Sequence, residues 1–129
     1  MYLDTDSVLA LVKESDWLKT DVEMRIKGEK TLCTSVMTVV ECRLVLIREE
    51  GRDVSHSVEK VLKKTKIQLL PLNEKILEKS RELSIKYDFL GVFDALHAAT
   101  SIVENETMLS TDHVFALIDE VKVTDPREG

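Results

Sequence analysis

Short apolar segments alternate with longer helical segments along this chain, and this alternation restricts its fold more than any other feature. The five strand-like segments cover residues 2–3, 31–34, 67–70, 107–109 and 121–124. Their apolar character indicates burial, and no hairpin turn joins one to the next. Strands that are separated by helices predict a parallel sheet with helices on both faces. We therefore predict a three-layer α/β/α fold around a central parallel sheet of about five strands.

The intervening segments have the periodicity of helices, and some carry end signals. We expect helices over residues 7–13, 16–27, 38–50, 53–66, 73–87, 93–104 and 112–118. Asp6 or Ser7 is expected to cap the first helix, and Gly28 and Gly51 to end the second and third. Apolar residues cover nearly every side of 38–50, which predicts a buried helix. The last four residues, 126–129, are expected to be frayed.

The composition is that of one soluble domain. With 129 residues, 43% of them hydrophobic, the chain can form one core and is too short for two ordinary domains, so we expect a single domain over 1–129. No apolar run reaches the about 18 residues of a membrane span, and the acidic start is unlike a signal peptide. We expect a cytoplasmic protein in which Cys33 and Cys42 are buried and unbridged.

Four acidic residues lie at the edges of apolar segments. Asp4 and Asp112 each follow a predicted strand, whereas Glu41 and Asp94 project from largely apolar helices. Each has a plainer explanation: Asp4 and Asp112 are typical helix caps, and the Thr38 to Glu41 spacing fits a capping box. Because ligands bind beyond the carboxyl ends of parallel strands, the strand-end acids lie at the correct edge for a site, and we predict that all four share one pocket.

Clustered carboxylates repel one another unless a cation binds between them. Oxygen ligands with several retained waters and a substrate phosphate are the usual environment of Mg²⁺. Such an ion would activate water and neutralise charge on a phosphodiester, which makes hydrolysis by one or two metal ions the chemistry that fits.

Four segments of the chain together resemble, in order, the successive motifs of PIN-domain proteins. They are Tyr2-Leu3-Asp4-Thr5-Asp6-Ser7, the helix beginning near Thr38-Val39-Val40-Glu41, Asp94-Ala95-Leu96-His97-Ala98-Ala99 and Leu109-Ser110-Thr111-Asp112-His113. The resemblance runs from Tyr2 to about Thr124 and is closest to the VapC-like ribonuclease toxins. It implies an Mg²⁺- or Mn²⁺-dependent endoribonuclease with Asp4, Glu41, Asp94 and Asp112 as catalytic metal ligands, and a toxin held inactive by an antitoxin protein. It also implies a homodimer, for which the helices near 8–12 and 36–47 are candidates for the apolar face.

Three neighbouring residues are candidates to support the ligands rather than to bind metal. Ser110 lies where the family usually has Thr or Ser. The chain departs from the family at Asp6, more often Asn or Ser, and at His97, more often apolar. Asp6 adds negative charge at the mouth of the site. His97 is either a donor to the site or an ordinary packed residue.

The charge balance constrains how RNA could bind. A net charge of −6 argues against long-range attraction of nucleic acid by the whole surface but leaves room for a local basic strip. We take Arg43, Lys63 and Lys64 as candidate phosphate contacts, although such a run is also typical of a solvated helix face.

Other functions are compatible with parts of the sequence. A PIN-type RNA-processing nuclease outside a toxin system and a weakly active RNA-binding or scaffold subunit are alternatives. Asp4-Thr5-Asp6 also resembles the start of aspartate-nucleophile phosphatases, but Leu109-Ser110-Thr111-Asp112 lacks the acidic pair expected there.

Overall fold

The computed structural model describes residues 1–54 and 56–128. Its centre is a five-stranded sheet in the order β3-β2-β1-β4-β5, and every pairing is parallel. The strands are β1 (Tyr2–Leu3), β2 (Leu32–Ser35), β3 (Ile67–Leu70), β4 (Met108–Leu109) and β5 (Val123–Thr124). The predicted three-layer α/β/α fold with a parallel sheet is confirmed.

The connecting segments are helical, as expected, and their bounds differ from the prediction mainly at the first turns. They are α1 (Thr5–Val12), α2 (Lys19–Ile26), α3 (Val36–Glu50), α4 (His56–Thr65), α5 (Glu74–Lys86), α6 (Val92–Val103) and the 3₁₀ helix η1 (His113–Leu117). The expected start of α4 at residue 53 is too early, and Ser55 lies outside the described residues. Gly51 ends α3 in the left-handed conformation (φ 70°), as its position predicted.

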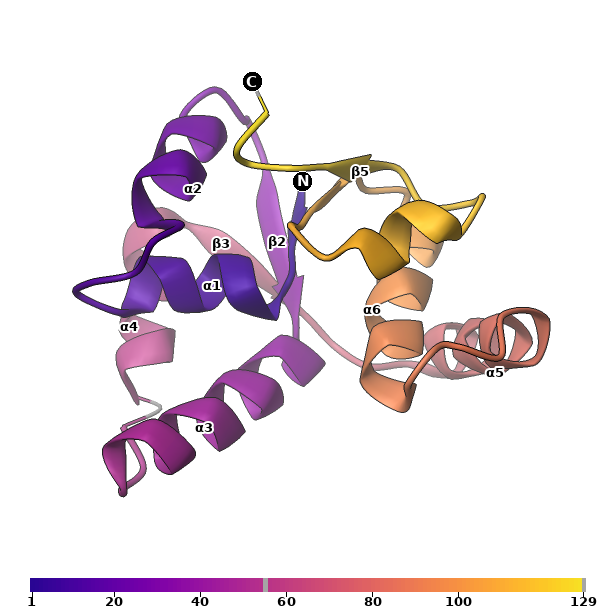
Figure 1. Ribbon diagram of the computed structural model, residues 1–129, viewed down its shortest axis with the longest axis horizontal. Coiled ribbons are helices and arrows are strands. Elements are labelled where there is room, and N and C mark those ends of the chain that lie inside the picture. Colours follow the sequence, from indigo (N-terminus) through magenta and orange to yellow (C-terminus); the bar gives the residue numbers. More distant parts are fainter. Residues whose placement is uncertain (55, 129) are drawn as a thin grey trace.

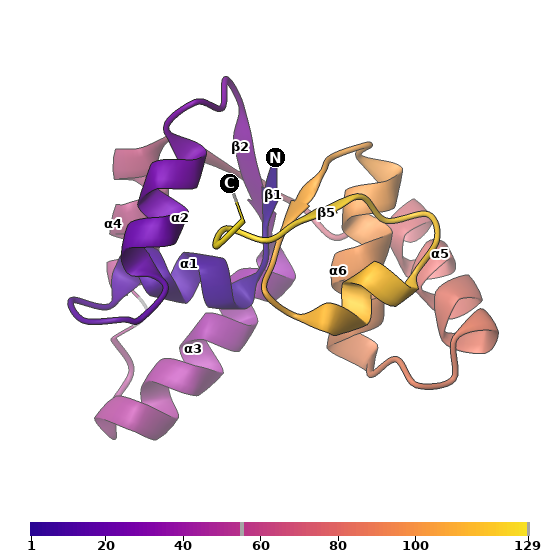
Figure 2. The same ribbon diagram turned by 45° about the horizontal axis from the view of Figure 1, so that its top comes forward.

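Helices cover both faces of the sheet, and each face has its own core. Figure 1 shows α1 to α4 on one side and α5 and α6 on the other, and the turned view of Figure 2 keeps this separation. One cluster of buried side chains joins Leu3 and Leu109 to α1–α4, including Val8, Val22 and Leu46. A second cluster joins Tyr2 and Met108 to α5, α6 and η1. Consecutive β1 residues therefore anchor opposite layers, as the alternation of side chains along a strand requires.

The order of the strands creates a switch point at β1. From β1 the chain moves to β2 and β3 on one side, and later returns to place β4 and β5 on the other. Helices that follow β1 and β4 leave toward opposite faces, so the carboxyl ends of these two neighbouring strands border a crevice. Asp4 follows β1, and Ser110 follows β4.

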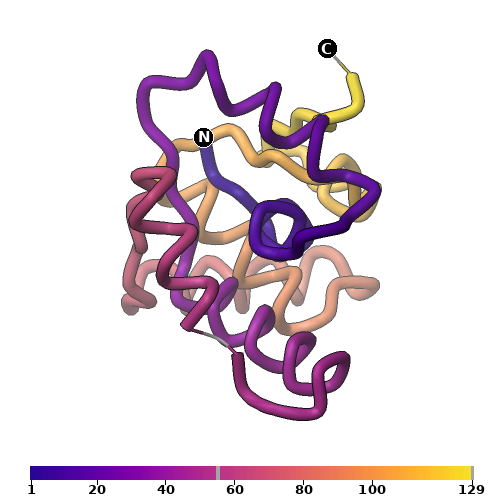
Figure 3. The backbone as a smooth tube through the Cα atoms, turned by 90° about the vertical axis from the view of Figure 1, so that its left-hand side faces the viewer, coloured from indigo at the N-terminus to yellow at the C-terminus, as the bar shows by residue number. Residues whose placement is uncertain are grey.

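The expectation that α3 is buried on all sides is wrong. Its buried residues are Thr38, Cys42 and Leu46, which lie four residues apart on one face. The opposite face exposes an apolar row, the α3 stripe, formed by Val36, Val40, Leu44 and Ile47. Figure 3, seen from the side of α1 to α4, shows α3 at the lower edge of the molecule.

Two further expectations concern the cysteines and the end of the chain. Cys33 and Cys42 are both free and buried, which confirms that prediction. The Arg127 guanidinium lies 5.7 Å from the Trp17 ring centre and also pairs with Asp125. Fraying of residues 126–129 stays a prediction, and Gly129 lies outside the described residues. Among the described residues no helix is long and apolar enough to cross a membrane.

Candidate metal and active site

A cavity of about 160 Å³ opens at the switch point of the sheet. All four predicted acids line it, together with Asp6 and His97: the full lining is Asp4, Thr5, Asp6, Glu41, Val45, Asp94, His97, Asp112 and Phe115. These residues come from the loop after β1, from α1, α3 and α6, and from the loop after β4 with η1. Four segments distant in sequence therefore supply one acidic pocket.

Asp4 is the most buried of the acids, with 4% of its surface exposed. Its Oδ1 accepts a bond from the Ser7 backbone N–H (3.0 Å), and its Oδ2 accepts one from the Ser110 hydroxyl (2.5 Å). Asp4 rather than Asp6 or Ser7 thus caps α1, which corrects the expected cap. Burial raises the pKa of Asp4 to about 6 even though these hydrogen bonds favour the carboxylate.

Glu41 does not form the capping box that its spacing suggested. The cap of α3 is Ser35, whose hydroxyl accepts from the Thr38 N–H at 3.3 Å, so the helix begins earlier than expected and Glu41 lies inside it. The Glu41 carboxylate instead accepts a hydrogen bond from Thr5 Oγ1 (2.7 Å) and is bonded to His97 Nε2. Burial acts to raise the pKa of Glu41, but these two hydrogen bonds outweigh it and lower the pKa.

Asp94 and Asp112 are less constrained. Asp112 Oδ1 caps η1 by accepting from the Val114 N–H at 3.0 Å, so the cap role proposed for Asp112 is present as well as its place in the pocket. Asp94 makes no hydrogen bond or ion pair to any described residue. Burial, and next the charge of Asp112, raise the pKa of Asp94. Burial with Asp112 and Glu41 does the same for Asp6 at the mouth.

His97 is a packed residue and a donor to the site at once. Only 2% of its surface is exposed, and its ring lies against Phe115 at 6.5 Å in an edge-on arrangement. Its Nδ1 lies 2.6 Å from the Tyr2 hydroxyl on β1. Sequence reasoning missed Tyr2 and Thr5, because nothing in an isolated apolar strand or a helix start indicates a hydrogen bond to a residue more than 30 positions away.

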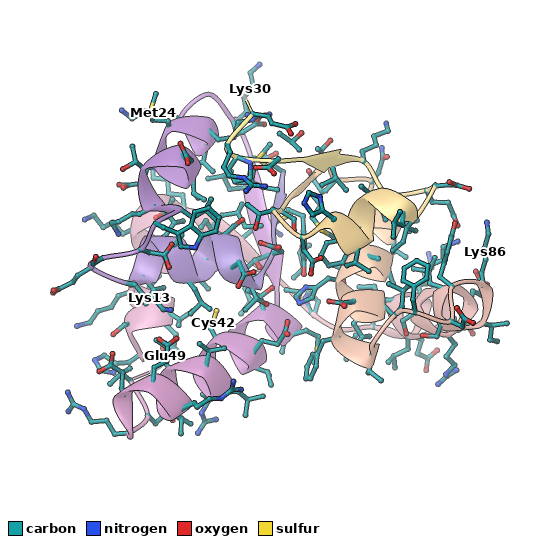
Figure 4. All side chains as sticks on the ribbon, in the orientation of Figure 1. Lys13, Met24, Lys30, Cys42, Glu49 and Lys86 are labelled. Atoms are coloured by element: carbon teal, nitrogen blue, oxygen red, sulfur yellow. The ribbon has the colours of Figure 1, made fainter. Side chains whose placement is uncertain are left out.

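The predicted basic residues do not line the pocket. Arg43 is exposed on α3 and pairs with Asp53 at 2.9 Å. Lys63 and Lys64 lie in the last turn of α4, which leads into the first residue of β3 and so ends at the edge of the sheet opposite the acids. Lys13, at the end of α1, is paired with Glu49 (3.0 Å), and Figure 4 labels both. Contact of Arg43, Lys63 and Lys64 with RNA stays a prediction.

The pocket offers the donor chemistry of a hard cation without a finished cage. Its candidate ligands are carboxylate oxygens, and no Lys or Arg is among the described residues that line it. Within residues 1–54 and 56–128, no three His, Cys, Asp or Glu side chains converge closely enough to hold one ion by themselves. Magnesium commonly binds through one or two carboxylates and several waters, so this set fits a hydrated Mg²⁺ or Mn²⁺ better than zinc.

A parallel α/β sheet with carboxylates gathered at its switch point defines a class of proteins that place an acidic ligand site beyond the strand ends. Within this class, the model of the PIN domain family matches residues 1–121, and the chain belongs to that family.

Solved structures show the same fold over nearly the whole chain. VapC20 from Mycobacterium tuberculosis, described as a sarcin–ricin-loop-cleaving toxin, has a TM-score of 0.76 at 17% identity and covers 94% of this chain and 98% of its own. FitAcB from Neisseria gonorrhoeae has a TM-score of 0.74 at 17% identity, with 99% of each chain covered. A toxin–antitoxin complex from Klebsiella pneumoniae has a TM-score of 0.72 at 17% identity, covering 97% of this chain and 96% of that one. Among curated proteins, none matches this chain in sequence.

Proposed function

We propose that this protein is a divalent-metal-dependent endoribonuclease and the toxin of a toxin–antitoxin pair. The observation that carries the proposal is the convergence of Asp4, Glu41, Asp94 and Asp112 on one pocket of a PIN-family fold. The toxin role draws on the structural neighbours, one described as a sarcin–ricin-loop-cleaving toxin and another as a toxin–antitoxin complex.

The four acids would bind the ion, some directly and others through its waters, and orient the phosphodiester. A bound Mg²⁺ or Mn²⁺ would lower the pKa of a bound water and neutralise charge on the reacting phosphate. Asp4 is fixed by Ser7 and Ser110, and Glu41 by Thr5 and His97, so both are held in place before any ligand binds. Asp94 has both oxygens free of other described residues. This mixture of fixed and unpaired carboxylates favours precise placement of an ion that still carries water.

The acidic pocket also suggests how an antitoxin protein could inhibit the enzyme. A guanidinium that entered the pocket could pair with the unpaired Asp94 and compete with the metal ion. RNA would approach against a net charge of −6, so bound cations and local contacts, rather than the whole surface, would provide the attraction.

Cleavage of a mixed pool of structured RNA tests the proposal. Purified protein is incubated with Mg²⁺, Mn²⁺ or EDTA, and fragments are separated on a denaturing gel. We expect cleavage with either metal and none with EDTA, because the pocket has no Lys or Arg to stabilise the reacting phosphate. Cleavage that persists in EDTA would contradict metal dependence. An intact pool in every metal would favour an RNA-binding subunit over a nuclease.

A homodimer is part of the same proposal, and the α3 stripe is the face that would form it. The other candidate, the helix near Val8, is excluded as an open face because Val8, Leu9 and Ala10 are buried. Leu44, 52% exposed in the middle of the stripe, is the residue to change. We expect Leu44→Lys to convert a dimer to a monomer in sedimentation velocity. Ile85→Lys on α5 is the matched control, since Ile85 is 85% exposed outside the stripe, and a dimer that survives Leu44→Lys would exclude this interface.

A further inference from the structure

A chain of buried hydrogen bonds runs from the sheet to the Glu41 carboxylate. The Tyr2 hydroxyl, on β1, lies 2.7 Å from Ser35 Oγ and 2.6 Å from His97 Nδ1. The other ring nitrogen, Nε2, is bonded to Glu41 Oε1. Tyr2 is fully buried and His97 nearly so, so neither side chain can exchange these partners for water.

The carboxylate fixes the direction of the bond to Glu41, and one consistent set of directions follows for the others. Glu41 accepts as a carboxylate, so His97 Nε2 must carry the proton that lies between them. When Nδ1 carries no proton, it accepts a hydrogen bond from the Tyr2 O–H. Ser35, whose hydroxyl is also the cap of α3, can donate to the Tyr2 oxygen. With these roles every donor in the chain has an acceptor.

Both donors to Glu41 reach the same oxygen. Thr5 Oγ1 donates to Oε1 at 2.7 Å, and His97 Nε2 bonds the same atom. Oε2 makes no hydrogen bond to any described residue. Since Glu41 lines the pocket, its free oxygen is the one available to a ligand there.

We propose that His97, held by Tyr2, is a positioning residue that with Thr5 occupies Oε1 of Glu41 and so presents Oε2 alone to the metal ion. This inference rests on the proposed metal-dependent function and deepens it. One turn of α6 then contributes two residues to the site. Asp94 enters the pocket directly, and His97, three residues later, orients a ligand from α3. Groups that orient a ligand in this way typically contribute about 10- to 100-fold to metal affinity or activity.

The chain offers a matched pair of tyrosines for the test. Tyr2→Phe removes the hydroxyl that holds His97, whereas Tyr87→Phe removes the other tyrosine hydroxyl, which accepts from the Asp119 N–H outside the pocket. His97→Leu removes the donor to Glu41, and His97→Gln keeps an N–H donor on a side chain of similar reach. Thermal unfolding of each metal-free variant identifies any that fails to fold, and Tyr2→Phe leaves the His97 ring in place if His97→Leu does not fold.

The primary readout is binding of Mn²⁺ to metal-free protein by titration calorimetry, with RNA cleavage measured beside it. We expect His97→Leu to weaken Mn²⁺ binding about 10- to 100-fold, His97→Gln to recover part of the loss, and Tyr2→Phe to weaken it less, with Tyr87→Phe unchanged. Nitrogen NMR of the histidines should show a proton on Nε2 of His97 in the wild-type protein.

The outcomes separate this inference from the function on which it rests. Wild-type binding of Mn²⁺ with equal binding by folded His97→Leu and Tyr2→Phe would overturn the positioning role and leave the proposed function intact. A loss in His97→Leu that His97→Gln does not relieve would also overturn it, because a merely structural role would give that pattern. A wild-type protein that binds no Mn²⁺ and cleaves no RNA would overturn both.

Discussion

Asp94→Asn is expected to abolish RNA cleavage while leaving the metal-free protein folded and as stable as the wild type or more so. The side chain lines the pocket and makes no hydrogen bond or ion pair to any described residue, so the change breaks no native contact. Burial and the charge of Asp112 raise the pKa of Asp94, which means that its ionised form is disfavoured in the metal-free fold. Removing the charge relieves that cost, but it also removes a ligand. Because even groups that only orient ligands contribute about 10- to 100-fold, we expect cleavage to fall by more than about 100-fold.

The measurement compares initial cleavage rates and thermal unfolding for wild type, Asp94→Asn and Asp88→Asn. Asp88 is an exposed carboxylate just before α6 and outside the pocket, so its variant controls for the loss of one negative charge near this helix. We expect Asp88→Asn to cleave RNA at the wild-type rate. Full activity in Asp94→Asn would show that the acidic pocket is not the site of chemistry, and a collapsed melting temperature would show that Asp94 is structural.

Which acids meet could be predicted because strand order in a parallel sheet leaves few places for a site. Asp4 and Asp112 follow segments that were apolar enough to be recognised as strands, and β3 was located at its observed bounds from its apolar run alone. Once the sheet is parallel, the carboxyl ends of all strands share one edge. Asp94 and Glu41 were found for a different reason, since an acid on a largely apolar helix requires a partner.

Helix starts could not be predicted as well, because several residues near each start can act as caps. Asp4, Asp6 and Ser7 all suit the start of α1, and Ser35 and Thr38 both suit the start of α3. The choice depends on tertiary contacts: Asp4 Oδ2 is also held by Ser110 from β4, and Ser35 Oγ by Tyr2 from β1. Sequence patterns contain the candidates, but contacts across the sheet select among them.

The exposure of the α3 stripe could not be predicted from the sequence, for a related reason. Val36, Val40, Leu44 and Ile47 are as apolar as the residues on the buried face, so the pattern has no clear polar side. The sequence could not show which side of this helix faces the core, and the structure places Thr38, Cys42 and Leu46 there.

Ionisation of Asp4 is expected to lower the free energy of unfolding of the metal-free protein as pH rises from about 4 to about 6. Burial raises the pKa of Asp4 from its usual value near 4 to about 6 in the folded state. Between these values the folded state binds more protons than the unfolded state, so stability falls as pH increases. A shift of about two pH units corresponds to about 3 kcal/mol, an order-of-magnitude figure for a residue that is almost fully buried.

The shifted pKa values of other pocket acids also change how stability depends on pH. Asp6 and Asp94 also have raised pKa values, so ionisation of either adds to the loss of stability. Glu41 has a lowered pKa and works in the opposite sense, because its stabilising contribution is present above the ordinary pKa of a Glu and is lost as pH falls through the lowered pKa. Mn²⁺ at neutral pH should reverse the loss, since a ligand present at 100 times its Kd stabilises a folded state by about 2.7 kcal/mol.

Urea unfolding in EDTA between pH 4 and pH 7.5 tests this, with Asp4→Asn as the decisive variant. Asparagine can keep the contact with the Ser7 N–H through its Oδ1, and its amide can donate to the Ser110 oxygen with the direction of that bond reversed. The variant should therefore lose the Asp4 contribution to the pH dependence, be more stable than the wild type at pH 7.5 without metal, and gain less from Mn²⁺. Asp119→Asn, at an exposed carboxylate, should behave as the wild type. If wild type and Asp4→Asn have the same pH dependence, ionisation of the buried Asp4 carboxylate does not destabilise the metal-free fold, and a bound cation would not stabilise the protein by relieving it.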